Sequence, residues 1–204
     1  MALIESEKPG KHPEPPEDFS ARKLPTFMLD ISLWRVHQAH YNPLYFSFSG
    51  DNRFDAPSKE YGILYLGVDE YCAFRESIGR LAKYRLITSS LLKSRKISVI
   101  KANRALKLVD LSGEGLTVLD ADARLCTGDY DIAQRWSLAL KNHPIRPDGL
   151  YYRSRHDPSR YCVALYEHLK TELTISESYD FLEDTFREKL ANILNIYNYG
   201  FSDT

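Results

Sequence analysis

The sequence has few cysteines, no long apolar run and almost no net charge, and each of these shortages excludes a class of protein. The three cysteines, Cys72, Cys126 and Cys162, are widely spaced and form no C-x-x-C pair. This pattern favours reduced thiols in a cytosol over a disulfide framework or a zinc site. Apolar runs such as residues 62–68 are far shorter than the roughly 20 residues of a membrane span. A formal net charge of −1 argues against bulk nucleic-acid binding.

Several common enzyme motifs are also missing. The sequence contains no G-x-S-x-G hydrolase elbow, no G-x-x-x-x-G-K-[ST] phosphate loop and no G-x-G-x-x-G dinucleotide motif. His37 and His40 form an H-x-x-H pair, but no Cys, Asp or Glu nearby completes a metal site, so we predict none. The first residues, which include Glu5, Lys8 and Pro9, lack the apolar core of a secretory signal. Together these features predict a cytoplasmic protein.

The residues that are present divide the 204-residue chain into three parts. Five prolines within residues 1–25 predict a disordered arm. Residues 26–172 form the expected folded domain. Residues 173–204 are expected to contribute a C-terminal amphipathic helix from Ser176 to Tyr199, because apolar residues recur there at helical spacing. Thr174 and Glu177 fit a capping box before this helix, and Gly200 fits a stop after it.

Within the domain, periodicity predicts strands and helices in irregular alternation. Residues 62–68 read as a strand buried on both faces, and Asp69 then caps a helix expected to run to Arg85. Further strands are expected at 29–37, 98–100 and 106–111, and a second helix from about residue 129 to the residue before Pro144. Segments 150–154 and 161–166 suit a hairpin. The pattern predicts an α+β fold, a single domain with mixed or antiparallel sheets and flanking helices.

Chemistry-bearing residues are dispersed over this predicted domain. Arg35 interrupts an apolar strand, where an unpaired guanidinium is costly unless it reaches solvent or faces a polar cleft. Arg53 lies in a turn-rich loop, and Tyr65 lies in the middle of a buried strand. The chain holds 14 tyrosines, which suit either the edges of a core or a pocket for a flat heterocycle.

Glu76 and Ser154 each allow two interpretations. Small neighbours of Glu76 on the same side of the helix, Cys72 and Gly79 among them, leave room for its carboxylate to face a cleft. Alternatively, Glu76 forms an ordinary ion pair with Arg80, four residues further on. Ser154 closes a strand, where serine is commonly a turn residue. Local pattern alone favours the ion pair for Glu76 and the turn role for Ser154.

Four sequence pieces, taken in order, resemble the RES-domain family, which is named for a dispersed Arg, Glu and Ser. They are LWRV at 33–36, GDNRF at 50–54, ILYLG followed by AFRE within 63–76, and DGLYYRSR followed by YCVAL within 148–165. The resemblance implies an ADP-ribosyltransferase-like fold that acts on NAD.

The resemblance also implies roles for five residues. Arg53, Tyr65, Glu76 and Ser154 match the family's catalytic positions, and Arg35 matches a substrate-binding position. A carboxylate suits cleavage of the nicotinamide–ribose bond, because positive charge develops on the ribose as the base leaves. Arginines suit the pyrophosphate of NAD. A tyrosine ring suits stacking on nicotinamide or a phosphate contact, and a serine hydroxyl suits the carboxamide.

Family members are often toxins whose antitoxin partner carries an Xre-type helix-turn-helix, and some cleave NAD by phosphorolysis. The resemblance therefore implies NAD as a consumed substrate, inorganic phosphate as a candidate second substrate, no required cofactor and an Xre-type partner. Hydrolysis, transfer of ADP-ribose to a macromolecule and a purely binding domain remain as alternatives. Whether the chain forms a homo-oligomer stays open.

Overall fold

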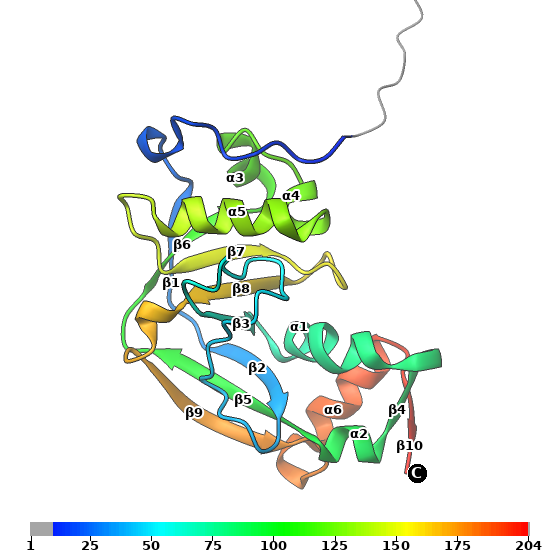
Figure 1. Cartoon of the computed structure of the whole chain (residues 1–204). Coiled ribbons are helices and arrows are strands. Elements are labelled where there is room, and N and C mark those ends of the chain that lie inside the picture. Colours follow the sequence, from blue (N-terminus) through cyan, green and yellow to red (C-terminus); the bar gives the residue numbers. More distant parts are fainter. Residues whose placement is uncertain (1–9, 204) are drawn as a thin grey trace, which may run out of the picture.

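The computed structural model describes residues 10–203, which form a long twisted sheet with helices at its two ends (Figure 1). The strands are β1 Thr26–Leu29, β2 Leu33–Gln38, β3 Ile63–Gly67, β4 Leu86–Thr88, β5 Arg95–Ala102, β6 Leu106–Leu111, β7 Gly149–Arg153, β8 Tyr161–Tyr166, β9 Leu173–Asp180 and β10 Gly200–Ser202. The α-helices are α1 Glu70–Phe74, α2 Ser89–Lys93, α3 Gly113–Val118, α4 Arg124–Thr127, α5 Tyr130–Lys141 and α6 Asp184–Ile196. A π-helical segment, η2 Arg75–Gly79, directly follows α1, and 3-10 turns occupy η1 Phe19–Ala21, η3 Lys83–Arg85 and η4 Glu167–Leu169.

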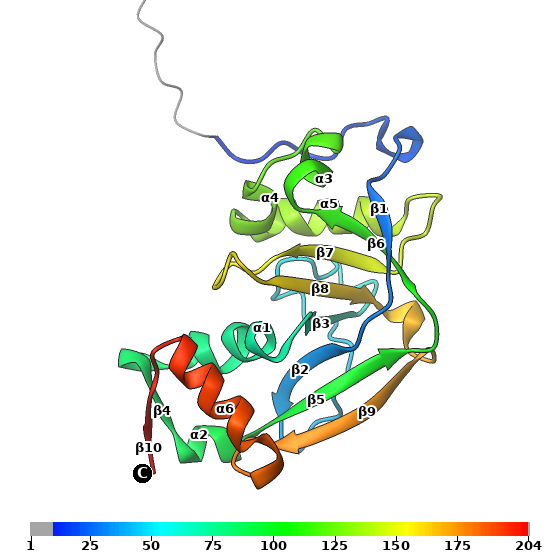
Figure 2. The ribbon, with the colours of Figure 1, turned by 180° about the vertical axis from the view of Figure 1, so that it is seen from behind.

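The main sheet has eight strands in the order β1-β6-β7-β8-β3-β2-β5-β9. Its neighbours pair antiparallel except β6 and β7, which run parallel. Parallel neighbours need a crossover connection, and α3, α4 and α5 supply it. This crossover places the three helices at one end of the sheet, whereas α1, α2 and α6 lie at the other (Figure 2). The α+β prediction is therefore confirmed.

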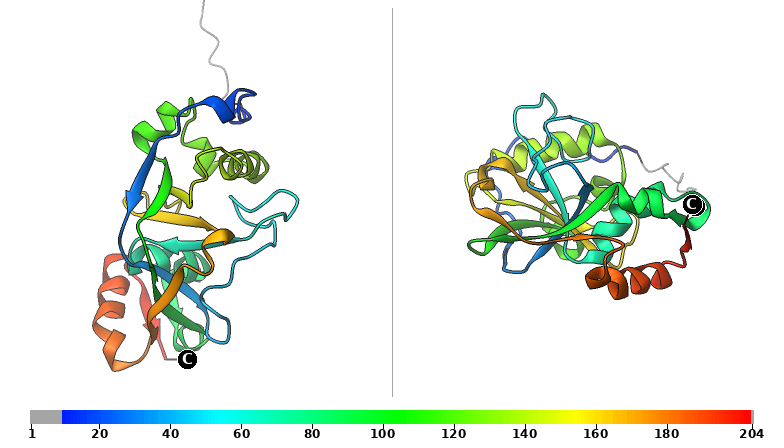
Figure 3. Two further views of the ribbon diagram at one scale, coloured as in Figure 1. Left: turned by 90° about the vertical axis from the view of Figure 1, so that its left-hand side faces the viewer. Right: turned by 90° about the horizontal axis from the view of Figure 1, so that it is seen from below.

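Three groups of buried side chains hold these layers together. One packs α5 and its neighbours against β6, β7 and β8, a second fills the middle of the sheet, and a third joins α1, α2 and α6 to β2 and β5. α5 and α6 lie on opposite sides of the sheet in the left view of Figure 3. A small parallel pair, β4 with β10, fixes the last strand beside the third group. Every helix within residues 10–203 is too short or too polar to cross a membrane.

Most of the domain follows the pattern predicted from its periodicity. The β3 strand, the Asp69 cap, α5 and the β7–β8 hairpin all occur, and the Asp69 carboxylate accepts from the Cys72 amide at 2.7 Å. The helix expected to reach Arg85 instead ends at Leu81, and five of its residues adopt the wider π-helical geometry.

The C-terminal prediction is wrong in its first part. Residues 173–180 form strand β9 on the edge of the sheet, where Thr174 pairs with Lys101 and Glu177 with Val99, so they make no capping box. Backbone pairing with β5 makes this segment a strand, although the sequence predicts that the helix begins at Ser176. The helix α6 begins only at Asp184, and Gly200 opens β10. The helix ends instead at Ile196, and Asn198, two residues further on, has a φ of 51°, the left-handed conformation that closes a helix C-terminus.

The predicted N-terminal disorder is also wrong for residues 10–25, whereas residues 1–9 lie outside the described part of the chain. Phe19 and Leu24 are buried against α5, and the Phe19 ring meets the Trp136 ring edge-on at 5.3 Å. The Trp136 indole donates to the Pro13 carbonyl at 2.9 Å. Prolines prevent regular structure here, but they do not prevent an irregular segment from packing.

Candidate functional site

A cavity of about 240 Å³ opens in the middle of the molecule, between β3, α1 and the crossover helices. Four of the predicted site residues line it: Arg35, Arg53, Tyr65 and Glu76. The fifth, Ser154, is hydrogen-bonded to Glu76. The fold therefore brings together residues that are far apart in sequence.

Two groups of residues flank the cavity. We call residues 50–56 together with Tyr65 the loop wall, and residues 75–80 together with 154–157 the helix wall. The loop wall comes from the connection between β2 and β3 and from β3 itself. The helix wall comes from η2 with the residue after it and from the turn between β7 and β8.

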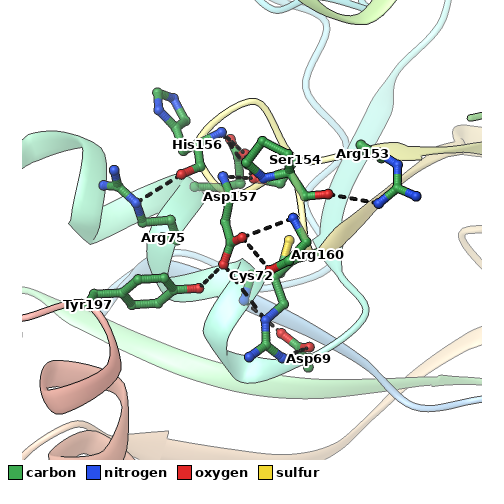
Figure 4. A network of polar contacts seen from close by, with 12 residues as sticks. Asp69, Cys72, Arg75, Arg153, Ser154, His156, Asp157, Arg160 and Tyr197 are labelled. Atoms are coloured by element: carbon green, nitrogen blue, oxygen red, sulfur yellow. Dashed lines mark hydrogen bonds and ion pairs between the residues drawn. The ribbon is translucent and has the colours of Figure 1, made fainter. Parts of the chain in front are cut away.

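Glu76 and Ser154 form the centre of the helix wall. The Ser154 hydroxyl, which is only 2% exposed, donates to Glu76 Oε1. The same hydroxyl oxygen accepts from the amides of His156 at 3.2 Å and Asp157 at 2.9 Å, so its one proton is directed at the carboxylate. Figure 4 shows Ser154 among the polar side chains of this turn. The interpretation of Ser154 as an ordinary turn residue therefore misses its contact with Glu76.

Glu76 sits on the π-helical segment. Within residues 10–203, no ion pair joins it to Arg80, so the simpler interpretation of this acid is not what the structure shows. A π-helical segment inserts an extra residue into a helical turn and is often found at functional sites. Here Ile78 and Gly79 are buried, and Glu76 is half-buried and lines the cavity.

Arg53 is the main cation of the loop wall. It is 8% exposed, its Nη1 donates to the Gly128 carbonyl at 2.8 Å, and its guanidinium carbon lies 4.6 Å from the centre of the Tyr130 ring. Burial lowers the pKa of this arginine from its ordinary value. Its buried Nη2 has no hydrogen-bond partner among the described residues. A buried donor without a partner is costly, and an anion in the cavity would satisfy it.

The Tyr65 hydroxyl is occupied by the loop wall itself. It donates to Asp55 Oδ1 at 2.9 Å and accepts from the Phe54 amide at 3.0 Å. Burial, with the nearby Asp55 charge, raises its pKa well above the ordinary value, so the hydroxyl remains a donor. The Asp55 carboxylate also accepts from Ser49 and Asn52. Tyr65 and Asp55 together fix the shape of the loop that carries Arg53.

Arg35 lines the cavity and also holds a second loop. Its Nη1 donates to the carbonyls of Pro43 at 2.6 Å and Tyr45 at 2.9 Å. Burial lowers the pKa of Arg35 to about 10, which leaves it charged at neutral pH. Of the two outcomes considered for this arginine, the structure shows the one in which it faces a polar cleft.

Sequence reasoning missed several residues of the cavity. Tyr130 begins α5 under Arg53, and Arg155 and His156 line the cavity from the β7–β8 turn. The polar run RHDPSR at residues 155–160 indicates a loop that includes Arg155 and His156, but the sequence does not show that this loop lies beside Glu76. Asp55 was missed as well, although it follows Arg53 by only two residues.

The described residues offer no group of three or more His, Cys, Asp or Glu side chains that would hold a metal ion. The cysteines Cys72, Cys126 and Cys162 are free and buried. The cavity therefore presents a carboxylate, arginines and aromatic rings, a set suited to an anionic ligand that carries a flat ring.

Comparisons with known proteins identify the family and the fold. The family pattern described as the RES domain matches residues 32–182, well over half of the chain. The probable toxin y4kH of Sinorhizobium fredii (strain NBRC 101917 / NGR234) is 29% identical over 101 residues, which cover 48% of this chain and 76% of that protein. A chain from the crystal structure of the M. tuberculosis MbcT–MbcA toxin–antitoxin complex is 14% identical. It superposes with a TM-score of 0.62 over 81% of this chain and 92% of that chain, which is a likeness of fold.

Proposed function

The chain belongs to the RES domain family, and we propose that its cavity binds NAD and breaks the bond between nicotinamide and ribose. The observation that carries this proposal is the placement of one carboxylate, Glu76, in the same cavity as the partly unsatisfied guanidinium of Arg53. A dinucleotide with two phosphates and a cationic ring offers partners of both charges.

The proposed role of Glu76 is to stabilise the ribose as positive charge develops on it. The C–N bond breaks with its electron pair leaving on nicotinamide, which departs neutral and needs no proton. Within residues 10–203, the hydrogen bonds that Glu76 accepts all fall on Oε1, so Oε2 is available to the ribose. Ser154 then orients the carboxylate rather than binding the carboxamide, because its one proton is donated to Glu76.

The proposed acceptor is either water or inorganic phosphate. Addition of water to the ribose carbon that carried nicotinamide gives ADP-ribose and a proton. Addition of phosphate to that carbon gives ADP-ribose phosphorylated there. Arg53 is the proposed contact of the pyrophosphate, because its Nη2 is buried beside the cavity without a partner in the described chain. Arg155 and His156, which also line the cavity, are candidates for binding inorganic phosphate when it is the acceptor.

The test is to incubate the purified chain with NAD, with and without phosphate, and to identify the products by mass spectrometry. We expect release of nicotinamide. A phosphorylated product that appears only with phosphate would identify phosphorolysis, and free ADP-ribose would identify hydrolysis. ADP-ribose attached to added protein or nucleic acid would replace this proposal with group transfer. Intact NAD in every arm would contradict the proposal and leave a binding domain.

We also propose that the chain is the toxin of a toxin–antitoxin pair that acts in the cytoplasm, where it would deplete NAD. The names of y4kH and of the MbcT–MbcA complex support this role. We expect expression in a bacterium to lower cellular NAD and arrest growth, and an Xre-type protein encoded beside it to restore growth. Normal growth and normal NAD in cells that contain the folded protein would contradict this role.

A further inference from the structure

Two tyrosines that follow α6 contact both halves of the helix wall. Tyr199 reaches η2, which carries Glu76, and Tyr197 reaches the β7–β8 turn, which carries Ser154. Both side chains are half-buried. Figure 4 shows Tyr197 pointing at Asp157 from the side of the C-terminal helix. The tail of the chain therefore meets the two elements whose side chains form the Glu76–Ser154 pair.

The Tyr199 hydroxyl bridges the first and last residues of the π-helical segment. It accepts from Arg75 Nη1 at 2.8 Å and donates to the Gly79 carbonyl at 3.0 Å. A Cβ atom at position 79 would lie 2.8 Å from this hydroxyl, so only glycine allows so close an approach. The wider π geometry interrupts the regular hydrogen bonding of a helix, and an outside hydroxyl is one way to satisfy the backbone there.

The Tyr197 hydroxyl fixes the other half. It donates to Asp157 Oδ2 at 2.6 Å, while the Asp157 amide donates to the Ser154 hydroxyl at 2.9 Å. Burial and the neighbouring Asp157 raise the pKa of Tyr197, so it stays protonated as a donor at neutral pH. Arg75 connects the two halves, because its Nε donates to the His156 carbonyl at 3.2 Å.

The turn at the end of α6 aims these side chains. Asn198, in the left-handed conformation, lies between the two tyrosines. The Tyr199 amide returns to the Leu194 carbonyl at 2.8 Å and the Asn198 amide to the Asn195 carbonyl at 3.1 Å, as in a Schellman motif. This closed turn and the β4–β10 pairing that follows it hold the tyrosines in place.

We propose that Tyr197 and Tyr199 are positioning residues for the reaction proposed above: their hydroxyls hold η2 and the β7–β8 turn at the separation that lets Ser154 orient Glu76. They do not line the central cavity, so the proposed role needs no contact with the substrate. Their effect passes through Arg75, Gly79 and Asp157, so it falls on turnover rather than on binding.

The experiment removes single hydroxyl groups with Tyr197→Phe and Tyr199→Phe in the full chain. These changes keep the ring contacts, including Tyr199 with Phe74. The matched control is Tyr179→Phe, because the Tyr179 hydroxyl is exposed on β9 and, within residues 10–203, bonds only Glu177. We expect kcat for NAD cleavage to fall by about tenfold or more in Tyr197→Phe and in Tyr199→Phe while KM changes little, because small misplacements of reacting groups are costly. The control should match the unmodified protein.

Amide hydrogen exchange supplies a measurement that needs no substrate. We expect faster exchange in residues 75–80 and at the amides of His156 and Asp157 in the two variants, and no change there in Tyr179→Phe. Exchange at the unmodified rate in these segments would overturn the inference, as would unchanged kcat with faster exchange. If the unmodified protein leaves NAD intact, the proposed function fails, and the exchange result alone decides whether the tyrosines position the helix wall.

Discussion

The loop wall and the helix wall use polar side chains in opposite ways. In the loop wall, the Tyr65 hydroxyl and the Asp55 carboxylate bond to each other and to the loop, so both serve to hold the loop conformation. In the helix wall, the hydrogen bonds converge on one oxygen of Glu76 and leave the carboxylate facing the cavity. The residues that the four sequence motifs single out thus fall into two groups. Some build the cavity, and others are available to act on a ligand in it.

The largest expected effect comes from the helix wall. Glu76→Gln removes the charge but keeps the shape, so NAD cleavage should fall by about 10²–10³-fold if Glu76 stabilises the transition state electrostatically. Steady-state kinetics of nicotinamide release measures it. Glu70→Gln, on the same helix but paired with Lys189 at 3.1 Å, is the control and should keep its turnover. Full activity in Glu76→Gln would rule out the proposed mechanism.

Ser154→Ala should have the next largest effect. It removes a hydrogen bond to a charged group, which corresponds to about 10- to 100-fold in kcat at the usual strength of such bonds. It also leaves the Asp157 amide without its acceptor and the His156 amide with only its longer bond to Glu76 Oε1 at 3.4 Å, so the melting temperature should fall. A KM increase with unchanged kcat would instead indicate that Ser154 binds the substrate directly.

Arg53→Lys tests the one residue of the loop wall that we assign to binding. Lysine keeps the charge but loses the planar contact with Tyr130 and the second donor, so KM should rise by about tenfold with a smaller change in kcat. The control is Arg135→Lys on α5, where the arginine pairs with Glu14 at the surface. An unchanged KM would remove Arg53 from the binding site.

The smallest expected effect on turnover is that of Tyr65→Phe. The hydroxyl serves the loop, so kcat/KM should change by less than about threefold. Stability should fall by about 2 kcal/mol, because the hydroxyl makes two hydrogen bonds with a usual net value of about 1 kcal/mol each. Urea unfolding and NAD kinetics on the same sample separate these two effects. Tyr61→Phe removes another internal hydroxyl, bonded to Ser137 at 3.0 Å, and should lose about half as much stability. A large loss of turnover in Tyr65→Phe alone would contradict the division between the two walls.

Sequence patterns predicted the strands and helices whose formation depends on neighbouring residues. The apolar run of β3 and the Asp69 cap are both short-range features, and both occur. The order of the four motifs predicted that the five site residues belong to one site. The fold places four of them around one cavity and the fifth, Ser154, in contact with Glu76.

Other features depend on partners far along the chain, so the sequence pattern could not reveal them. Residues 176–180 fall within the helix that the sequence predicts, but they lie in strand β9 because β5 offers an edge to pair with. The π-helical segment around Glu76 is hydrogen-bonded by the Tyr199 hydroxyl, which comes from far along the chain. The Pro-rich residues 10–25 pack because α5 presents Trp136 to them. Tertiary contact decides structure at each of these places.

The separation of the two halves of the helix wall has a consequence for protein synthesis. Glu76 and Ser154 are 78 residues apart, and Arg75 and Tyr199 are 124 residues apart. A nascent chain therefore carries the acid long before the ribosome has made the serine that orients it, and Tyr197 and Tyr199 are made later still. Because domains fold as units as they leave the ribosome, the helix wall can assemble only after residue 199 has emerged. Under the proposed function, a chain that stops short of that point would leave NAD intact.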